Sequence, residues 1–198
     1  MAYNPKDFYF KKAKEENFVA RSVFKLEEMD KKFKLFRHGQ TILDLGCAPG
    51  SWSQYVSKKI GHQGKLLGVD LAKVHLNLPN AVFVQGDAFS EEVLQNFMTE
   101  NAIETFDLVI SDMAPKTIGI RVTDQERSLQ LCKRALDVAL RTLKPGGHFI
   151  VKIFQGADTP EFTKSLRDHF QKVDIARPKS VRQQSFEVYI LGLNKKNL

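Results

Sequence analysis

The chain has 198 residues, 42% of them hydrophobic, and a formal net charge of +7. This length accommodates one sizeable hydrophobic core, so we expect a single domain over residues 1–198. No apolar run approaches the roughly 20 residues of a membrane span, and the first residues have no apolar stretch typical of a signal peptide. These features favour a cytoplasmic protein over a membrane or secreted one.

The positive charge is concentrated towards the two ends of the chain. Residues 1–37 carry 10 Lys/Arg against 6 Asp/Glu, and residues 161–198 carry 8 against 4. Residues 38–160 are close to neutral, with 12 against 13. A neutral body with basic ends is typical of a protein that holds an anionic macromolecule by its ends. Lysine-rich ends that are merely solvated would give the same pattern.

The elements predicted along the chain alternate between helix and strand. Apolar residues three or four apart from Val19 to Phe33 predict a helix before the first strand. Short apolar runs predict seven strands, at residues 41–46, 65–70, 81–87, 106–112, 148–154, 173–177 and 186–193. Helical patterns lie between them at residues 51–60, 90–100, 123–143 and 159–170. This alternation predicts an α/β fold, a mostly parallel sheet with helices on both faces.

Four aspartates lie at the ends of the first four predicted strands: Asp44, Asp70, Asp87 and Asp112. The carboxyl ends of parallel strands line one ligand crevice, so we expect these side chains to converge. A single aspartate in such a position is more often a turn or helix cap. Four of them beside a glycine turn favour a ligand site.

The glycine turn is the segment DLGCAPG, residues 44–50, which follows the first strand and opens a helix. Asp70 follows Gly46 by 24 residues, close to the spacing at which an acid binds ribose hydroxyls in dinucleotide folds. Pro49 removes an amide that a pyrophosphate would use, which disfavours NAD. S-adenosylmethionine, a nucleoside without phosphate, fits better, and a nicotinamide-dependent oxidoreductase is the alternative with the same sheet.

Charged residues interrupt two predicted strands. Lys152 lies within FIVKIFQG and Glu187 within SFEVYILGL, while Lys25 lies beside the apolar face of the first helix. Lysine is almost never buried without a partner, so a lysine inside a strand is a functional candidate, although its stem can also carry the charge out to solvent. Together with Asp112, these residues could form a charge-balanced buried cluster.

Five segments of the chain resemble the FtsJ-type ribosomal RNA ribose 2'-O-methyltransferases, and the resemblance runs from about Asp7 to Leu193. They are ARSVFKLEEMDKKFKLF, ILDLGCAPGSWSQYV, DLVISDMAP, LKPGGHFIVKIFQG and RPKSVRQQSFEVYIL. The resemblance implies a class I methyltransferase fold, Rossmann-like, with seven strands of which the last is antiparallel. It also implies a catalytic tetrad of Lys25, Asp112, Lys152 and Glu187. Implied cofactor contacts are Gly50, Trp52, Asp70, Asp87 and Asp112, in addition to Gly46 of the glycine turn.

The implied reaction is methyl transfer from S-adenosylmethionine, without a metal, to a uridine 2'-hydroxyl in the A-loop of 23S rRNA of the large ribosomal subunit. Lys152 would then orient or deprotonate the hydroxyl, two possibilities that the sequence leaves open. APGSWSQ and KAKEENFVARSVFKL also resemble transfer RNA anticodon-loop ribose methyltransferases. Ser51 and Lys116 replace a glycine and an asparagine that are usual in the ribosomal RNA family. Transfer RNA methylation therefore stays an alternative, as does a non-catalytic ribosome-assembly factor that binds RNA.

An RNA substrate would give the basic ends a role. Residues 1–37 are then a basic helical extension, and the expected phosphate contacts are Lys11, Lys12, Lys14, Arg21, Arg177, Lys179 and Arg182. Neither the five histidines nor the two cysteines have metal-ligand spacing, so we expect no metal site. We expect a monomer.

Overall fold

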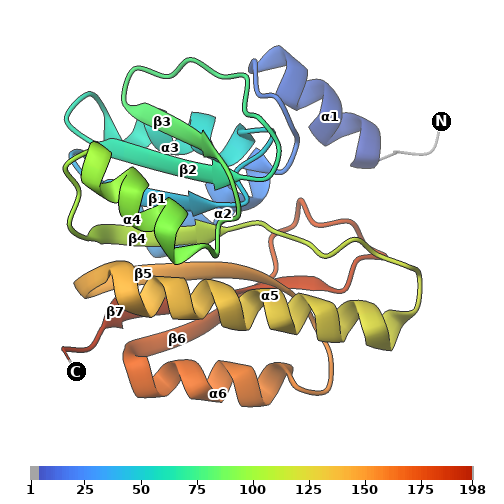
Figure 1. Ribbon diagram of the computed structural model, residues 1–198. Coiled ribbons are helices and arrows are strands. Elements are labelled where there is room, and N and C mark those ends of the chain that lie inside the picture. The colour runs from blue at the N-terminus through green and yellow to red at the C-terminus, as the bar shows by residue number, and fades with distance from the viewer. Residues whose placement is uncertain (1–4, 198) are drawn as a thin grey trace.

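A single seven-stranded sheet organises the molecule (Figure 1). The computed structural model describes residues 5–197. The strand order is β3-β2-β1-β4-β5-β7-β6. The strands are β1 (Thr41–Leu45), β2 (Lys65–Asp70), β3 (Ala81–Gln85), β4 (Phe106–Ser111), β5 (Leu143–Phe154), β6 (Phe170–Ala176) and β7 (Glu187–Lys195). All seven predicted strands are present, and the predicted class I methyltransferase sheet is confirmed.

Strand β7 runs against its neighbours. It pairs antiparallel with both β5 and β6, whereas β1 to β5 pair in parallel. Its first residue, Glu187, is therefore opposite Phe154 at the end of β5, and Tyr189 is opposite Lys152. The antiparallel direction places the beginning of β7 at the edge where the parallel strands end.

Helices cover both faces of the sheet, as the alternation predicted. They are α1 (Pro5–Glu15), α2 (Val23–Phe33), α3 (Ser51–Ile60), α4 (Glu91–Glu100), α5 (Arg121–Thr142) and α6 (Thr159–His169). One hydrophobic core packs α2 and α3 on one face, and a second packs α4, α5 and α6 on the other. Neighbouring strand residues serve opposite cores, Ile42 the first and Leu43 the second. No helix in residues 5–197 is long and apolar enough to cross a membrane.

The N-terminal region differs from the prediction of one helix that includes Val19. Two helices precede β1, and α2 begins only at Val23. Val19 lies in the turn between them, is 48% exposed, and donates its amide to Gln54 Oε1 at 2.9 Å. Asn17, with φ of 58°, adopts the left-handed conformation in this turn. The apolar spacing continues through the turn, so periodicity alone overestimated the helix.

Candidate active site

Two ion pairs lie at the edge where the parallel strands end. Lys152 Nζ of β5 is 3.0 Å from Asp112 Oδ1, directly after β4, and Lys25 of α2 pairs with Glu187 of β7. Lys152 is only 8% exposed. The structure thus brings together the four residues of the expected tetrad from four separate elements. Pairing makes their burial tolerable, since a lone buried charge would be strongly unfavourable.

The Lys152 ammonium is held at more than one point. It donates to the Asp112 backbone carbonyl as well as to the Asp112 carboxylate. The Lys152 carbonyl accepts a hydrogen bond from Cys132 Sγ of α5 at 3.1 Å. A protonated lysine has three N–H donors, so two are directed at Asp112 and one remains for a substrate oxygen.

Tyr189 also belongs to this cluster, although the sequence analysis did not identify it. Its hydroxyl donates to Asp112 Oδ1 at 2.7 Å, and the side chain is completely buried. Burial, reinforced by the nearby Asp112 and Glu187 carboxylates, raises the pKa of Tyr189 well above its ordinary value, so it remains a neutral donor. Its signal was its position two residues after Glu187, because alternate strand residues share a face.

The glycine turn after β1 is closely packed. Gly46 and Gly50 have φ of +71° and +107°, a conformation that side chains with a Cβ rarely adopt. A Cβ on Gly46 would lie 2.0 Å from Met113 Cγ, and one on Gly50 would lie 2.2 Å from Leu76 Cδ1. Both the positive φ and the contacts with Met113 and Leu76 therefore favour glycine at these two positions.

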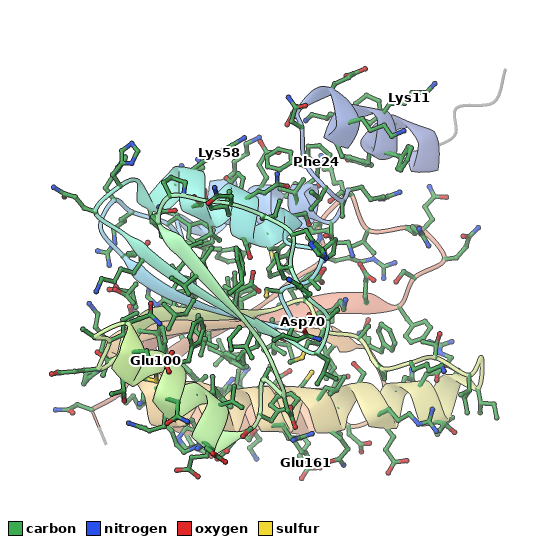
Figure 2. The ribbon with its side chains drawn as sticks, turned by 45° about the horizontal axis from the view of Figure 1, so that its top comes forward. Lys11, Phe24, Lys58, Asp70, Glu100 and Glu161 are labelled. Atoms are coloured by element: carbon green, nitrogen blue, oxygen red, sulfur yellow. The ribbon has the colours of Figure 1, made fainter. Side chains whose placement is uncertain are left out.

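Asp70, at the end of β2, is joined to this turn (Figure 2). Its two carboxylate oxygens accept the amides of Ala48 at 2.9 Å and Ala72 at 2.8 Å. A carboxylate has about four acceptor positions, so Asp70 retains capacity for ligand hydroxyls. Asp87 is half exposed and lies 3.5 Å from the Arg134 guanidinium. Both aspartates thus act as local caps and remain available to a nucleoside.

Asp44 lies behind the turn. It is 1% exposed and accepts a 2.6 Å hydrogen bond from Ser53 Oγ of α3. Burial raises the pKa of Asp44 to about 7; the Ser53 hydrogen bond opposes this rise, and the nearby Asp112 and Asp70 carboxylates add to it. Its role in the fold is to connect β1 to the first turn of α3.

Trp52 and Ser51 connect α3 to the residues before α2. The Trp52 indole donates to the Ser22 carbonyl at 3.0 Å, and the Ser51 and Ser22 hydroxyls are 2.8 Å apart. The Trp52 ring centroid is 5.7 Å from that of Tyr189. Because Trp52 is 3% exposed, it offers little surface to a cofactor. Its contacts connect α3 to Ser22 before α2 and to Tyr189 of β7.

The residues expected to contact RNA fall into two groups. Lys11, Lys12 and Lys14 lie on α1, where Lys12 is 3.6 Å from Glu16 and Lys11 is labelled in Figure 2. The second group lies around a cleft of about 480 Å³ that is also lined by Lys25 and Glu187. Arg21 and Arg182 line this cleft, while Arg177 and Lys179 belong to the same loop between β6 and β7 as Arg182.

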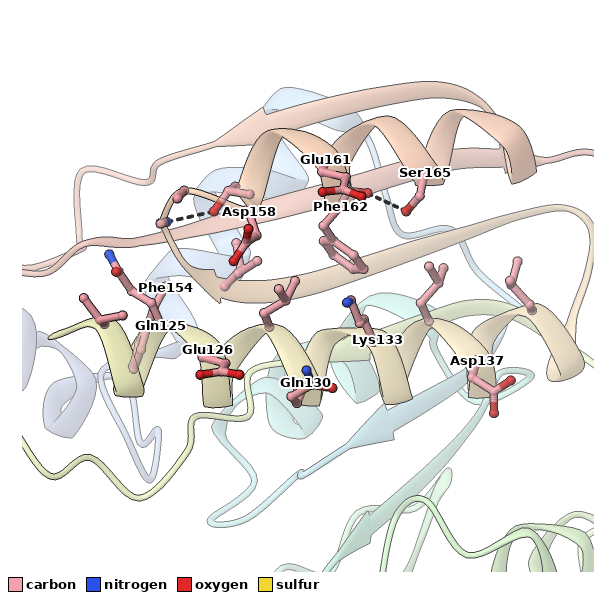
Figure 3. Close-up of a pocket in the computed structure, with 18 residues that line it drawn as sticks. Gln125, Glu126, Gln130, Lys133, Asp137, Phe154, Asp158, Glu161, Phe162 and Ser165 are labelled. Carbon is pink, nitrogen blue, oxygen red and sulfur yellow. Dashed lines mark hydrogen bonds between the residues drawn. The ribbon is translucent and has the colours of Figure 1, made fainter. Parts of the chain in front are cut away.

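A separate groove of about 630 Å³ runs between α5 and α6 (Figure 3). Its lining includes apolar Leu129 and Phe162 and acidic Glu126 and Glu161. No tetrad residue and no expected cofactor or RNA contact lines it, so this groove is not part of the candidate active site.

The described residues contain no group of three or more His, Cys, Asp or Glu that could hold a metal ion. Both cysteines, Cys47 and Cys132, are buried, and neither forms a disulfide. Burial raises the pKa of Cys132 to about 12 and raises that of Cys47 further above its ordinary value. Both thiols are therefore protonated near neutral pH and are not nucleophiles.

Comparison with known proteins gives consistent matches. Residues 18–195 match the model of the FtsJ-like methyltransferases. The chain is 53% identical to a ribosomal RNA large subunit methyltransferase E of Bdellovibrio bacteriovorus, over 99% of this chain and 100% of that protein. It is 49% identical to the protein of the same name in Desulfatibacillum aliphaticivorans, over 96% and 91% of the two chains.

Solved structures show the same fold. A Plasmodium falciparum protein assigned as a ribosomal RNA methyltransferase superposes with a TM-score of 0.79 at 28% identity, covering 90% of this chain and 98% of that one. Aeropyrum pernix fibrillarin, solved with S-adenosyl-L-methionine, has a TM-score of 0.57 at 20% identity, covering 79% of this chain and 67% of that one. The fibrillarin likeness concerns the fold alone.

Proposed function

The chain belongs to the FtsJ-like methyltransferase family, and we propose that it transfers a methyl group from S-adenosylmethionine to a ribose 2'-hydroxyl of ribosomal RNA in the large subunit. The observation that carries the proposal is the Lys152 ammonium, fixed by Asp112 beside the Lys25–Glu187 pair. Relatives of 49% and 53% identity carry the name ribosomal RNA large subunit methyltransferase E. A uridine of the 23S rRNA A-loop is the specific target that we propose, in the cytoplasm.

The glycine turn and its acids fit the methyl donor. Pro49 supplies no amide for a pyrophosphate, so the glycine turn suits a nucleoside without phosphate better than a dinucleotide. Asp70 would accept from ribose hydroxyls and Asp87 from the adenine amino group. Asp112 would face the cationic part of the ligand. When bound, S-adenosylmethionine supplies an electrophilic methyl group.

Lys152 would act by alignment. Its remaining N–H would donate to the 2'-oxygen and fix the direction of attack, while Asp112, which accepts from the Tyr189 hydroxyl, holds the ammonium in place. The 2'-oxygen would form its bond to the methyl carbon as the bond from that carbon to sulfur breaks, S-adenosylhomocysteine would leave, and the hydroxyl proton would pass to water. Lys25 and Glu187 line the neighbouring cleft and would position the ribose.

The test is transfer of labelled methyl to unmodified large ribosomal subunits and, separately, to unmodified transfer RNA. Lys152→Met removes the ammonium but keeps an apolar stem of similar length. Lys144→Met is the matched control, because Lys144 is exposed at the opposite end of the same strand. We expect label in subunits from the wild type and the control, and none from Lys152→Met, with cofactor binding retained.

Other outcomes would contradict the proposal. Label in transfer RNA alone would assign the chain to the transfer RNA alternative. No transfer to either RNA, despite cofactor binding, would favour a non-catalytic assembly factor. Substantial activity in Lys152→Met would remove the ammonium from the mechanism.

A further inference from the structure

The cleft beside the Lys25–Glu187 pair contains polar atoms that are buried and not hydrogen-bonded. Arg21 Nη1 and Ser180 Oγ both have this property, and both residues line the cleft. Glu187 Oε1 also lacks hydrogen-bond geometry but is in the ion pair with Lys25. A buried donor without a partner is unfavourable by roughly 1–3 kcal/mol, so atoms of this kind are rare in folded proteins. Two in one cleft indicate a site for a polar ligand.

The charges of the cleft indicate the sign of that ligand. Three basic residues line it, Arg21, Lys25 and Arg182, against one acid, Glu187. Because Lys25 pairs with Glu187, the two arginines leave the cleft with a net positive charge. Among the side chains of residues 8–197 no carboxylate forms an ion pair with Arg21 or Arg182. Burial and the nearby Arg182 lower the pKa of Arg21. An anion beside the two guanidinium groups would favour their charged forms and so oppose this lowering.

Contacts with neighbouring residues hold Arg21 and the loop of Ser180 in place but do not use Arg21 Nη1 or Ser180 Oγ. Arg21 Nη2 donates to the Ser180 carbonyl at 2.7 Å, and the guanidinium lies 5.4 Å from the centre of the Tyr9 ring. Glu28 of α2 accepts the backbone amides of Lys179 at 2.6 Å and Ser180 at 2.9 Å. The loop that carries Ser180 is therefore attached to α2 at two points. Such preorganisation reduces the entropy lost on binding.

We propose that this cleft binds the phosphodiester on the 3' side of the ribose that is methylated. This inference rests on the proposed function. A guanidinium and a hydroxyl together suit phosphate oxygens. Lys25 and Glu187 belong to both the cleft and the tetrad, so the bound phosphate must lie next to the reacting ribose. The 3'-phosphate is attached to the carbon beside the one that bears the 2'-hydroxyl, whereas the 5'-phosphate is further along the chain.

The first arm of the test does not depend on methyl transfer. Thermal unfolding is followed with increasing inorganic phosphate at constant ionic strength, for the wild type, Arg21→Gln and Ser180→Ala. Ser180→Ala removes only the unpaired hydroxyl and keeps the backbone contacts to Arg21 and Glu28. Arg167→Gln is the control, because Arg167 is exposed on α6. We expect phosphate to raise the midpoint of the wild type and control, and much less that of the two cleft variants.

The second arm measures kcat/KM on unmodified large subunits over a range of salt. Arg21→Gln should lower kcat/KM by about 10-fold to 100-fold. The slope of log kcat/KM against log salt should become shallower by about one, as expected when one phosphate contact is lost. Cofactor affinity should not change.

Several results would overturn the inference. In one, phosphate raises the unfolding midpoint of all four proteins equally or leaves that of the wild type unchanged. In another, Arg21→Gln keeps the wild-type slope of log kcat/KM against log salt. If the wild type transfers no methyl group, the proposed function fails, but the phosphate arm still decides whether the cleft binds an anion.

Discussion

The buried carboxyl of Asp44 makes the stability of the protein depend on pH. Burial raises its pKa from 3.8 to about 7. Between these values the unfolded chain has lost the Asp44 proton while the folded protein retains it, so the free energy of unfolding falls as the pH rises. Each pH unit well inside this window corresponds to about 1.4 kcal/mol, and raising the pH from 5 to 8 removes about 3 kcal/mol. Above about pH 8 the contribution of Asp44 is constant.

Urea unfolding of the ligand-free wild type and Asp44→Asn between pH 5 and 9 measures this effect. Asparagine has the same shape, can still accept from Ser53 Oγ, and does not titrate. All other titrating groups are present in both proteins and largely cancel in the difference. The stability of Asp44→Asn relative to wild type should rise by about 3 kcal/mol from pH 5 to 8 and then stay level. A difference independent of pH would refute a protonated, buried Asp44.

Two further substitutions test the site and its support. Tyr189→Phe removes the donor to Asp112 and should lower the methyl-transfer rate by about tenfold, since a hydrogen bond to a charged group contributes about 1.5–3 kcal/mol; a rate within twofold of wild type would contradict this. Gly46→Ala should destabilise the fold by several kcal/mol in urea unfolding, because its Cβ meets Met113 Cγ. Gly39→Ala, at a similar φ of +79° with open space, should cost only about 1 kcal/mol; equal losses would mean that the contact is unimportant.

The sequence was sufficient to predict the sheet and to single out four charged residues that the structure brings together. Strands and helices followed from apolar periodicity, and Lys152 and Glu187 stood out because a charge interrupts an apolar run. Tyr189 did not stand out, because tyrosine is an ordinary strand residue and its hydroxyl bond to Asp112 depends on the register of β5 and β7. The tyrosine ring fits an apolar strand, so its hydroxyl does not interrupt the apolar run as a charged residue does.

The cleft could not be predicted for a different reason. Arg21 and Ser180 are 159 positions apart and are joined by the hydrogen bond from Arg21 Nη2 to the Ser180 carbonyl. Glu28 of α2 holds the same loop by accepting the amides of Lys179 and Ser180. No local pattern encodes such a contact. Charge counting placed basic residues at both ends of the chain, but only the fold shows that Arg21 and Arg182 line one cleft while the lysines of α1 do not line it.

Membership of the FtsJ-like family excludes the nicotinamide-dependent alternative, which the glycine turn alone only disfavoured.

The position of β7 has a consequence for biosynthesis. It is the last of the seven strands to leave the ribosome, yet it lies between β5 and β6, whose facing edges stay unpaired until it arrives. The same strand carries Glu187 and Tyr189, so the sheet and the candidate site both depend on the last strand to be synthesised. A chain interrupted before this strand therefore has neither a continuous sheet nor a complete candidate site, and the exposed edges of β5 and β6 favour aggregation of such a fragment.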